Sequence, residues 1–290
     1  MAEVLNEIDM KLHDEIHAEM MRQNPADILA NPRLKIFPYV ELLHQEINGV
    51  VADIGCGSGY ASIWLALNRK NIGRIDAIEG SQPAVNELLP RNIEHYDVSS
   101  VVNPRYATFD DLGDNIYDYV VAMGAIHHSR NLQSTFDSIF RSLKTGGMLI
   151  AQEPAMPDTT TQAEYDEKYN IVEERYGLSI RNGDRYDRFF RECEYKAAIV
   201  QSGLDILHWM NWPPSASSKL PFSKQVSVVL RSLRNDGLIA TIRKIHGHAT
   251  NTNKTSDSSW QTQMRHATRH VQSKLIVARK NSTTKQYHRD

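Results

Sequence analysis

From residue 49 onward, short apolar runs alternate with amphipathic segments. Seven runs have the length of strands, at 49–54, 74–79, 101–108, 117–123, 148–153, 204–209 and 274–279. Apolar residues spaced three and four apart predict helices at 60–68, 82–94, 131–143 and 192–202. Continuous apolar strands alternating with helices are typical of a parallel sheet covered on both faces. The pattern therefore predicts an α/β fold.

Four segments lie outside this alternation. Residues 1–24 have the spacing of an amphipathic helix that ends at Asn24-Pro25, and 33–48 predict a second helix. Residues 154–191 are polar, rich in Tyr and Arg, and helical in pattern. Residues 215–270 contain a basic helix between Lys224 and Ile245 and a polar loop at 247–259. We therefore divide the chain into units at 1–48, 49–153, 154–191 and 192–290, the last with an insertion at 215–270.

Composition excludes several classes of protein. The 290 residues are 41% apolar and 23% charged, which is ordinary for a globular protein and excludes collagen, coiled coil and wholesale disorder. Two cysteines cannot form a disulfide framework, so a reducing compartment is expected and we predict a cytoplasmic protein. No run of about 18 apolar residues is present, and the acidic N-terminal segment lacks the pattern of a signal peptide.

The small net charge of −2 conceals a division between the two ends of the chain. Residues 215–290 hold 14 of the 33 Lys and Arg but three of the 35 Asp and Glu, a net charge of +11. The first 214 residues therefore carry a net charge of −13. A basic segment on an acidic body indicates either an acidic partner or the segment folding back on the body.

The chemically informative motif is Asp53-Ile54-Gly55-Cys56-Gly57-Ser58-Gly59, between a predicted strand and a predicted helix. Glycines at alternate positions allow a tight bend and close approach to a ligand, and the helix that follows presents free N–H groups. Glu79 ends the next strand, where a carboxylate accepts hydrogen bonds from ribose hydroxyls. Asp53 would repel a pyrophosphate but attract an amino group. The motif therefore favours S-adenosylmethionine over NAD.

The sequence resembles the class I S-adenosylmethionine-dependent methyltransferases, and in particular their small-molecule or sugar branch. The matching segments, in the family's order and spacing, are Asp53–Gly59, Ile78–Ser81, Tyr117–His128 and Leu143–Ile150. The resemblance covers about residues 45–155, and more weakly 192–211 and 274–280. It implies a Rossmann-like, seven-stranded, mostly parallel sheet whose last strand is antiparallel.

The resemblance also implies how this chain holds S-adenosyl-L-methionine and the product S-adenosyl-L-homocysteine. The glycines would cradle the methionine portion, Asp53 would orient it, and Glu79 would bind the ribose. The full set is Asp53, Gly55, Cys56, Gly57, Gly59, Glu79, Gly80, Ser81, Phe109, Asp110, Asp111, Met123 and Gly124. The family's usual Gly-Asp is missing at 108–112, which leaves the choice between Asp110 and its neighbours open. We interpret Cys56 as a small packing residue in the loop, not a nucleophile.

Three residues at strand ends are candidates for acid–base chemistry. His127 and His128 follow the fourth strand, at the edge where ligands bind, and either could be the general base or a pocket-lining residue. Glu153 ends the fifth strand and could act as a base or orient one. Metal-dependent relatives carry an acid just after the fourth strand, where this chain has Met123-Gly124. We therefore predict a catalytic site without metal.

Acceptor recognition is assigned to the lid that the resemblance places over the cofactor, formed by 1–48 and 154–191. Arg185 and Arg188 would bind a phosphate or carboxylate of the acceptor, with salt bridges to the acidic body as the alternative. We add Tyr39 and Tyr60 to this set. The stretch 186–195, followed by Gln201–Leu204, resembles methyltransferases of bacterial surface-polysaccharide synthesis.

Three functions follow as hypotheses. The first is a methyltransferase acting on a small-molecule or sugar hydroxyl, in surface-polysaccharide or secondary-metabolite biosynthesis. The second is an RNA- or protein-modifying methyltransferase that uses the basic 215–290 segment, although no RNA-binding module is evident, so nucleic acid is disfavoured as a partner. The third is a non-catalytic cofactor-binding scaffold. An insertion anchored between the last two strands favours self-association, an anionic acceptor or a membrane surface as its partner.

Overall fold

A computed structural model describes residues 20–161, 163–164, 166–167, 189–213 and 271–281. Seven strands form one sheet. They are β1 (Gly49–Ile54), β2 (Ile72–Glu79), β3 (Val102–Tyr106), β4 (Tyr117–Met123), β5 (Leu143–Ala155), β6 (Leu204–Asn211) and β7 (Gln272–Lys280). Each coincides with one of the seven apolar runs, so the strand prediction is confirmed.

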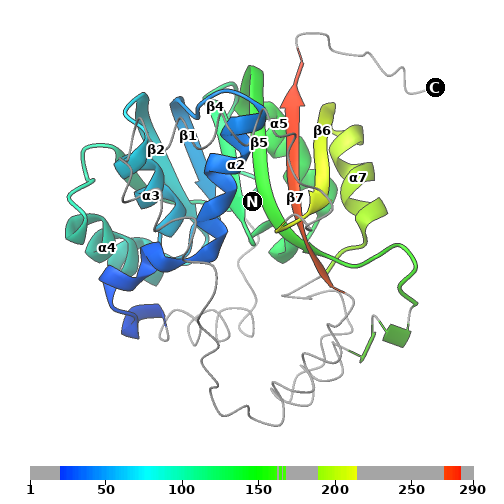
Figure 1. Ribbon diagram of the computed structural model, residues 1–290, viewed down its shortest axis with the longest axis horizontal. Coiled ribbons are helices and arrows are strands. Elements are labelled where there is room, and N and C mark those ends of the chain that lie inside the picture. Colours follow the sequence, from blue (N-terminus) through cyan, green and yellow to red (C-terminus); the bar gives the residue numbers. More distant parts are fainter. Residues whose placement is uncertain (1–19, 162, 165, 168–188, 214–270, 282–290) are drawn as a thin grey trace.

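The sheet has the order β3-β2-β1-β4-β5-β7-β6 (Figure 1). Strands β1 to β5 pair in parallel, whereas β7 lies antiparallel between β5 and β6. This confirms the Rossmann-like fold with an antiparallel last strand. The order reverses at β1, so the carboxyl ends of β1 and β4 define the crevice where ligands bind in such sheets.

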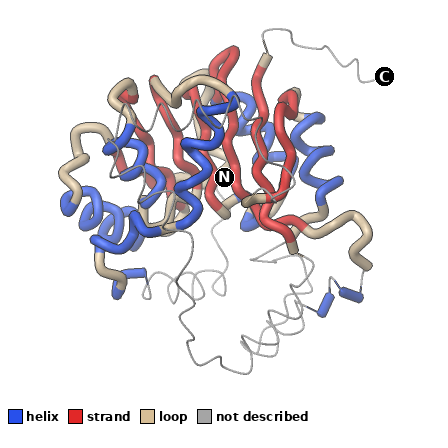
Figure 2. The backbone as a smooth tube through the Cα atoms, viewed as in Figure 1, coloured by secondary structure: helices blue, strands red, loops and turns tan. Residues whose placement is uncertain are grey.

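Helices cover both faces of the sheet (Figure 2). They are α2 (Ile36–Leu43), α3 (Tyr60–Asn68), α4 (Leu89–His95), α5 (Leu132–Ser142) and α7 (Glu192–Gln201), with short turns η1 (Pro25–Ala30), η2 (Pro32–Lys35), η3 (Ala84–Leu88) and η4 (Ile126–His128). Helices α2, α3 and α4 share one buried cluster with the sheet, and α5 and α7 share the other. Strand residues alternate between the two clusters, as the twofold strand period requires.

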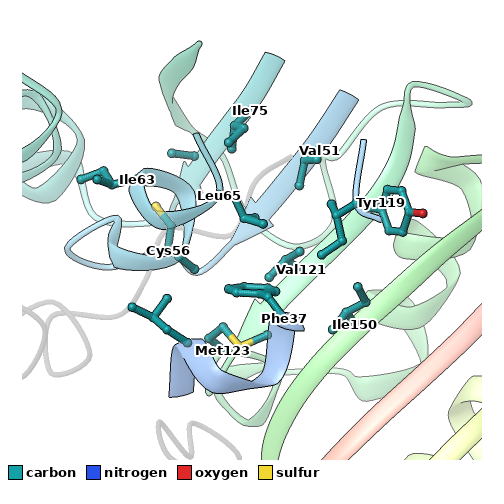
Figure 3. Packing of buried hydrophobic residues seen from close by; sticks show 14 of the residues in the cluster. Phe37, Val51, Cys56, Ile63, Leu65, Ile75, Tyr119, Val121, Met123 and Ile150 are labelled. Carbon is teal, nitrogen blue, oxygen red and sulfur yellow. The ribbon is translucent and has the colours of Figure 1, made fainter. Parts of the chain in front are cut away.

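Packing on the first face brings the N-terminal segment to the site. Phe37 of α2 is fully buried in one cluster with Val121, Met123 and Ile150, near the carboxyl end of β4 (Figure 3). Its ring stacks on Trp64 of α3 at 5.3 Å between centroids. Helix α2 is thereby fixed over the ligand-binding edge.

The helix predicted at 33–48 is shorter and is preceded by two 3-10 turns. Asn24 and Asn31 each precede a proline, and each side-chain oxygen accepts a backbone N–H two residues later, at 3.1 and 3.0 Å. Each Asn-Pro pair therefore starts a new turn, and α2 begins only at Ile36. The helix expected at 1–24 lies outside the described residues up to position 19.

The helix predicted at 82–94 contains a π-helical turn at η3. Pro90 has no N–H, and its ring would collide with the carbonyl of Asn86, four residues earlier. The helix widens instead, and the Leu89 N–H bonds to the carbonyl of Ala84, five residues back. Sequence reasoning placed this helix correctly but overlooked Pro90.

Residues 212–271 connect two adjacent antiparallel strands, β6 and β7. The basic insertion at 215–270 thus has both ends at the ligand-binding edge, but its helix at Lys224–Ile245 lies outside the described residues. So do residues 168–188 of the segment 154–191. None of the helices in the described part of the chain is long and apolar enough to cross a bilayer.

Candidate active site

The loop after β1 has the backbone that its glycines permit. Gly55, Gly57 and Gly59 all have positive φ, at 61°, 54° and 77°. A Cβ on Gly55 would lie 2.5 Å from the Ala125 Cβ, and one on Gly59 would lie 2.7 Å from Leu89 Cδ2. At Gly57 the nearest atoms are those of Met20, at 3.8 and 3.9 Å. The lack of a side chain at Gly55 and Gly59 therefore allows close packing, whereas the lack of one at Gly57 leaves the loop open toward a ligand.

Asp53 lies beneath the loop and is only 1% exposed. Its Oδ2 accepts hydrogen bonds from the Ser62 backbone N–H at 3.0 Å and the Ser62 hydroxyl at 2.7 Å. Burial raises the pKa of Asp53 to about 7 despite these two bonds, and the nearby Glu79 contributes in the same direction. Because burial disfavours the ionised form of Asp53, a neighbouring cation would stabilise that form.

Glu79 joins the glycine loop to the end of β2. Its Oε2 accepts the Gly57 N–H at 2.9 Å, and its Oε1 accepts the N–H groups of Gly80 and Ser81 at 2.9 and 3.3 Å. The side chain is only 7% exposed. Cys56 is buried, and its N–H donates to the Ile78 carbonyl at 3.1 Å, in keeping with its interpretation as a packing residue. The sequence placed these residues at one edge, and the structure brings them into direct contact.

In the segment after β3, the contacts of Asp111 distinguish it from Asp110 as a candidate for the adenine side. Phe109 lies beside the loop, with Cε1 3.5 Å from a Cβ placed on Gly55. The Asp111 N–H donates to the Thr108 carbonyl at 3.2 Å, and the Arg105 guanidinium donates to the Asp111 carbonyl at 2.8 Å. Asp111 is thus used in a turn facing Arg105. This arrangement favours Phe109 and Asp110 for the adenine side, a role that stays a prediction.

On the other side of β1, Met123 ends β4 and Gly124 follows it, beneath the N-terminal segment. The Met123 carbonyl accepts hydrogen bonds from Arg33 Nη1 at 2.8 Å and from the Tyr60 hydroxyl at 3.1 Å. Gly124 has φ of +76°, and a Cβ there would lie 2.6 Å from Arg33 Nη1. Burial raises the pKa of Tyr60 to about 12, although the adjacent Arg33 lowers it. Tyr60 therefore stays protonated and donates its proton.

Glu153 and His127 form a buried pair at the ends of β5 and β4. Glu153 is fully buried, and His127 is 8% exposed. Glu153 Oε2 lies 2.9 Å from His127 Nδ1, and its two oxygens accept the N–H groups of Ala125, Ile126 and His127. The His128 ring lies beside that of His127, with centroids 4.0 Å apart. All three candidates for acid–base chemistry are therefore together.

The two tyrosines predicted to bind the acceptor lie in different parts of the structure. Tyr60 lies at the β4 edge, but the Tyr39 hydroxyl contacts Met210 Sδ at 3.6 Å and its ring packs edge-on against Trp212, beside β6. Arg185 and Arg188 lie outside the described residues. Sequence reasoning missed Arg33. The only signal was an arginine just after Asn31-Pro32, and nothing in the pattern indicates that its side chain reaches β4.

An open cleft of about 470 Å³ separates the N-terminal turns from the glycine loop. Its walls are Gln23, Asn24, Asp27, Ile28, Ala30, Asn31, Pro32, Ser58 and Tyr60. The side chain of Asn92, itself buried, donates to the Ser58 carbonyl at 2.8 Å and fixes the loop. An open glycine loop, two buried carboxylates and this cleft lie where the sheet order reverses. Together they define a Rossmann-like nucleoside-binding domain.

Comparison with known proteins finds a methyltransferase domain in this chain. Residues 52–149 match the model of the methyltransferase domain. Ubiquinone biosynthesis O-methyltransferase of Rickettsia prowazekii is 23% identical over 180 residues, which are 60% of this chain and 67% of that protein. Sterol 24-C-methyltransferase of Schizosaccharomyces pombe is 27% identical over 168 residues, 54% of this chain and 40% of that protein. Homologues from Rickettsia akari and Rickettsia conorii are covered over only 59% and 64% of their length.

Solved structures show the same fold. Geranyl diphosphate methyltransferase in complex with S-adenosylmethionine superposes with a TM-score of 0.58 at 12% identity, covering 88% of this chain and 90% of that one. The cyclase SpnF superposes at 0.56 with 17% identity, covering 86% and 81%. The methyltransferase-domain match and the methyltransferase relatives, together with this fold, show that the chain contains a class I S-adenosylmethionine-dependent methyltransferase domain, whose cofactor is S-adenosyl-L-methionine.

The residues present fit this cofactor. The open side of Gly57 leaves room for the methionine portion, and Asp53 suits a neighbouring cation. Glu79 ends β2 beside the loop, where a carboxylate can accept hydrogen bonds from ribose hydroxyls. No cluster of three or more His, Cys, Asp or Glu occurs within the residues that the structure describes. Independence from metal stays a prediction.

The pKa of Asp53 predicts that cofactor binding depends on pH. The protonated group cannot attract the ammonium of the cofactor, so affinity for S-adenosylhomocysteine should fall as the pH decreases through 7, by at most about tenfold per pH unit. Binding above neutral pH should need no proton release, whereas binding at pH 6 should release a proton. Calorimetry in two buffers of different ionisation enthalpy measures this. In Asp53→Asn, binding should be weaker and lose this pH dependence; an unaltered pH dependence contradicts the assignment.

Proposed function

We propose that this domain methylates a hydroxyl group of a small-molecule acceptor, with His127 as general base and Glu153 as its positioning residue. The observation that carries the proposal is the 2.9 Å contact between His127 Nδ1 and the buried Glu153 carboxylate. A neutral hydroxyl needs a base to become a good nucleophile, whereas an amine mainly needs positioning. A carboxylate-oriented histidine therefore supports oxygen as the methylated atom.

The contacts of the pair support a separate role for each residue. Glu153 accepts a hydrogen bond from the Nδ1–H group of His127, which favours the tautomer whose Nε2 is basic. His127 then takes the acceptor's hydroxyl proton at Nε2, and Glu153 stabilises the resulting imidazolium. Three backbone N–H groups hold Glu153 in place, so the pair keeps its orientation before the acceptor arrives. The cofactor, when bound, supplies an electrophilic methyl group, and the protein aligns the acceptor with it and excludes water.

The relatives support a small acceptor. Those named above are methyltransferases of ubiquinone biosynthesis and of sterols, and one related structure holds geranyl diphosphate. SpnF, a cyclase with the same fold, shows that the fold alone does not determine the reaction. The proposal therefore rests on the His127–Glu153 pair and not on the fold.

Methyl-labelled S-adenosylmethionine tests the proposal. The purified protein is incubated with a cell extract divided into a small-molecule filtrate, an RNA fraction and a protein fraction. We expect the label in a product of the filtrate, in a linkage stable to mild base, as for an ether. Label found only in RNA or protein would overturn the proposal in favour of a macromolecular acceptor. Cofactor binding without transfer to any fraction would indicate the scaffold instead.

A further inference from the structure

Helix α4 holds the N-terminal segment across the site through backbone carbonyls. Arg91 Nη1 donates to the Met21 carbonyl at 2.6 Å, and its Nη2 donates to the Gln23 carbonyl at 3.4 Å. The Tyr96 hydroxyl donates at 2.8 Å to a third carbonyl, two residues further along. We call residues 20–25 the N-terminal strap. Two side chains of α4 therefore hold three alternate carbonyls of this strap.

The guanidinium of Arg91 is fixed in turn by Asn92, which is fully buried. Asn92 Oδ1 accepts hydrogen bonds from Arg91 Nε at 3.2 Å and from its Nη2 at 3.1 Å. Asn92 Nδ2 donates to the Ser58 carbonyl of the glycine loop at 2.8 Å. Turning the amide over would set its NH2 group against the guanidinium and its oxygen against the carbonyl, so these neighbours determine its orientation. Arg91 and Asn92 thus link the strap to the glycine loop.

The π-helical turn at η3 sets the direction of these two side chains. The extra residue in this turn rotates every later residue of the helix by about 100° relative to a regular α-helix. Gly59 has no side chain, and a Cβ there would lie 2.7 Å from Leu89 Cδ2, so α4 packs directly on the loop. Asn92 follows Leu89 by three residues and lies on the same face of the helix.

The two walls of the cleft are the two parts that this link joins. Gln23 belongs to one wall, and Ser58 and Tyr60 belong to the other. Met20 lies across the open side of Gly57, with its Cε and Sδ 3.8 and 3.9 Å from a Cβ placed there. These are the terminal atoms of a flexible side chain, which can turn aside for a ligand while the strap backbone stays bonded to α4. A cofactor on the glycine loop would therefore lie behind the strap.

We propose that Arg91 is a positioning residue for the cofactor and acts through Asn92, so that the cofactor leaves only after the bonds between α4 and the strap break. The inference concerns cofactor release and does not depend on the acceptor or on His127. Hydrogen bonds from a guanidinium are charge-assisted, which makes their loss costly. Arg91 is only partly buried, so the strap can open without disrupting the core. The strap therefore sets the rate at which S-adenosylhomocysteine is released.

Release of labelled S-adenosylhomocysteine tests this inference. The loaded protein is mixed with an excess of unlabelled ligand, without any acceptor. In Arg91→Met the label should leave about 10- to 100-fold faster, because charge-assisted bonds are lost, while the association rate changes little. Arg91→Lys keeps a positive charge but not the fork of donors, so it should restore part of the retention. Arg141→Met, which alters an exposed arginine of α5 paired with Asp114, is the matched control.

Tyr96→Phe gives a milder test, because it removes one hydroxyl from a partly buried residue. Loss of the bond to the Pro25 carbonyl should speed release by about 2- to 10-fold. Tyr106→Phe, at an exposed tyrosine on β3, is its control and should leave the release rate unchanged.

The double variant of Arg91→Met and Asn92→Ala tests whether the two residues act in series. If they do, it should release the ligand no faster than the faster of the single variants, whereas multiplied effects would contradict the role of Asn92. Melting temperatures show which variants are folded, and Tyr96→Phe decides the outcome if replacement of the buried Asn92 prevents folding. Unchanged release in folded Arg91→Met and Tyr96→Phe proteins would overturn the inference. So would a loss of affinity that arises from slower association alone.

Discussion

Replacing Glu79 with alanine is expected to weaken S-adenosylhomocysteine binding by about a hundredfold or more. The carboxylate accepts the N–H groups of Gly57, Gly80 and Ser81, so its loss leaves the loop without its link to β2. It also removes the acceptor that the family uses for the ribose hydroxyls. A hydrogen bond to a charged group contributes about 1.5–3 kcal/mol. The loss of two such bonds to the ribose would therefore lower affinity by more than about a hundredfold. Titration calorimetry measures the change.

Two further variants make this result specific. Glu79→Gln keeps the shape but loses the charge and presents an NH2 group where an acceptor is needed, so it should also bind weakly. Glu87→Ala alters an exposed carboxylate on η3 and should bind as the unaltered protein does. Melting temperatures separate weak binding from unfolding. Unchanged affinity in a folded Glu79→Ala protein would show that the ribose lies elsewhere.

Replacing His127 with alanine should lower kcat by about 10²- to 10⁴-fold, the usual contribution of a general base. Affinity for S-adenosylhomocysteine should change little, because His127 lies beyond β4 from Glu79. Single-turnover rates with labelled cofactor provide the test, and an unchanged rate in a folded His127→Ala protein would contradict the role of general base.

The neighbouring residues decide between the two histidines. His128→Ala should retain most of the rate, because the Glu153 carboxylate lies against His127 Nδ1. Glu153→Gln should reduce kcat, since the imidazolium that forms during the reaction loses its charged partner. His95→Ala, at an exposed position on α4, is the control. A larger loss in His128→Ala than in His127→Ala would assign the base to His128.

The cofactor half of the site could be predicted from sequence because its determinants are local. β1 and α3 occur at the expected residues, and the three glycines between them adopt the positive φ for which glycine is suited. Glu79 follows from the same logic, since parallel strands end at one edge. Periodicity and turn chemistry act over a few residues, and the sequence displays both.

Contacts between distant segments could not be predicted in the same way. Arg33 is 90 residues from the carbonyl to which it donates, and no local pattern indicates that pairing. Tyr39 is predicted to contact the acceptor, but its side chain packs against Met210 and Trp212 beside β6, two residues more than 170 positions away in the sequence. The π-helical turn depends on Pro90, whose effect on the helix is a matter of three-dimensional crowding. These features arise from tertiary packing.

The structure of the protein crystallised with S-adenosylhomocysteine tests the central claim most directly. The account predicts ribose hydroxyls within hydrogen-bond distance of Glu79, adenine beside Phe109, and the methionine portion over Gly57 with its amino group toward Asp53. The sulfur should face the end of β4, between Arg33 and His127. A ligand bound away from the glycine loop, or with its sulfur directed away from β4, would contradict the account.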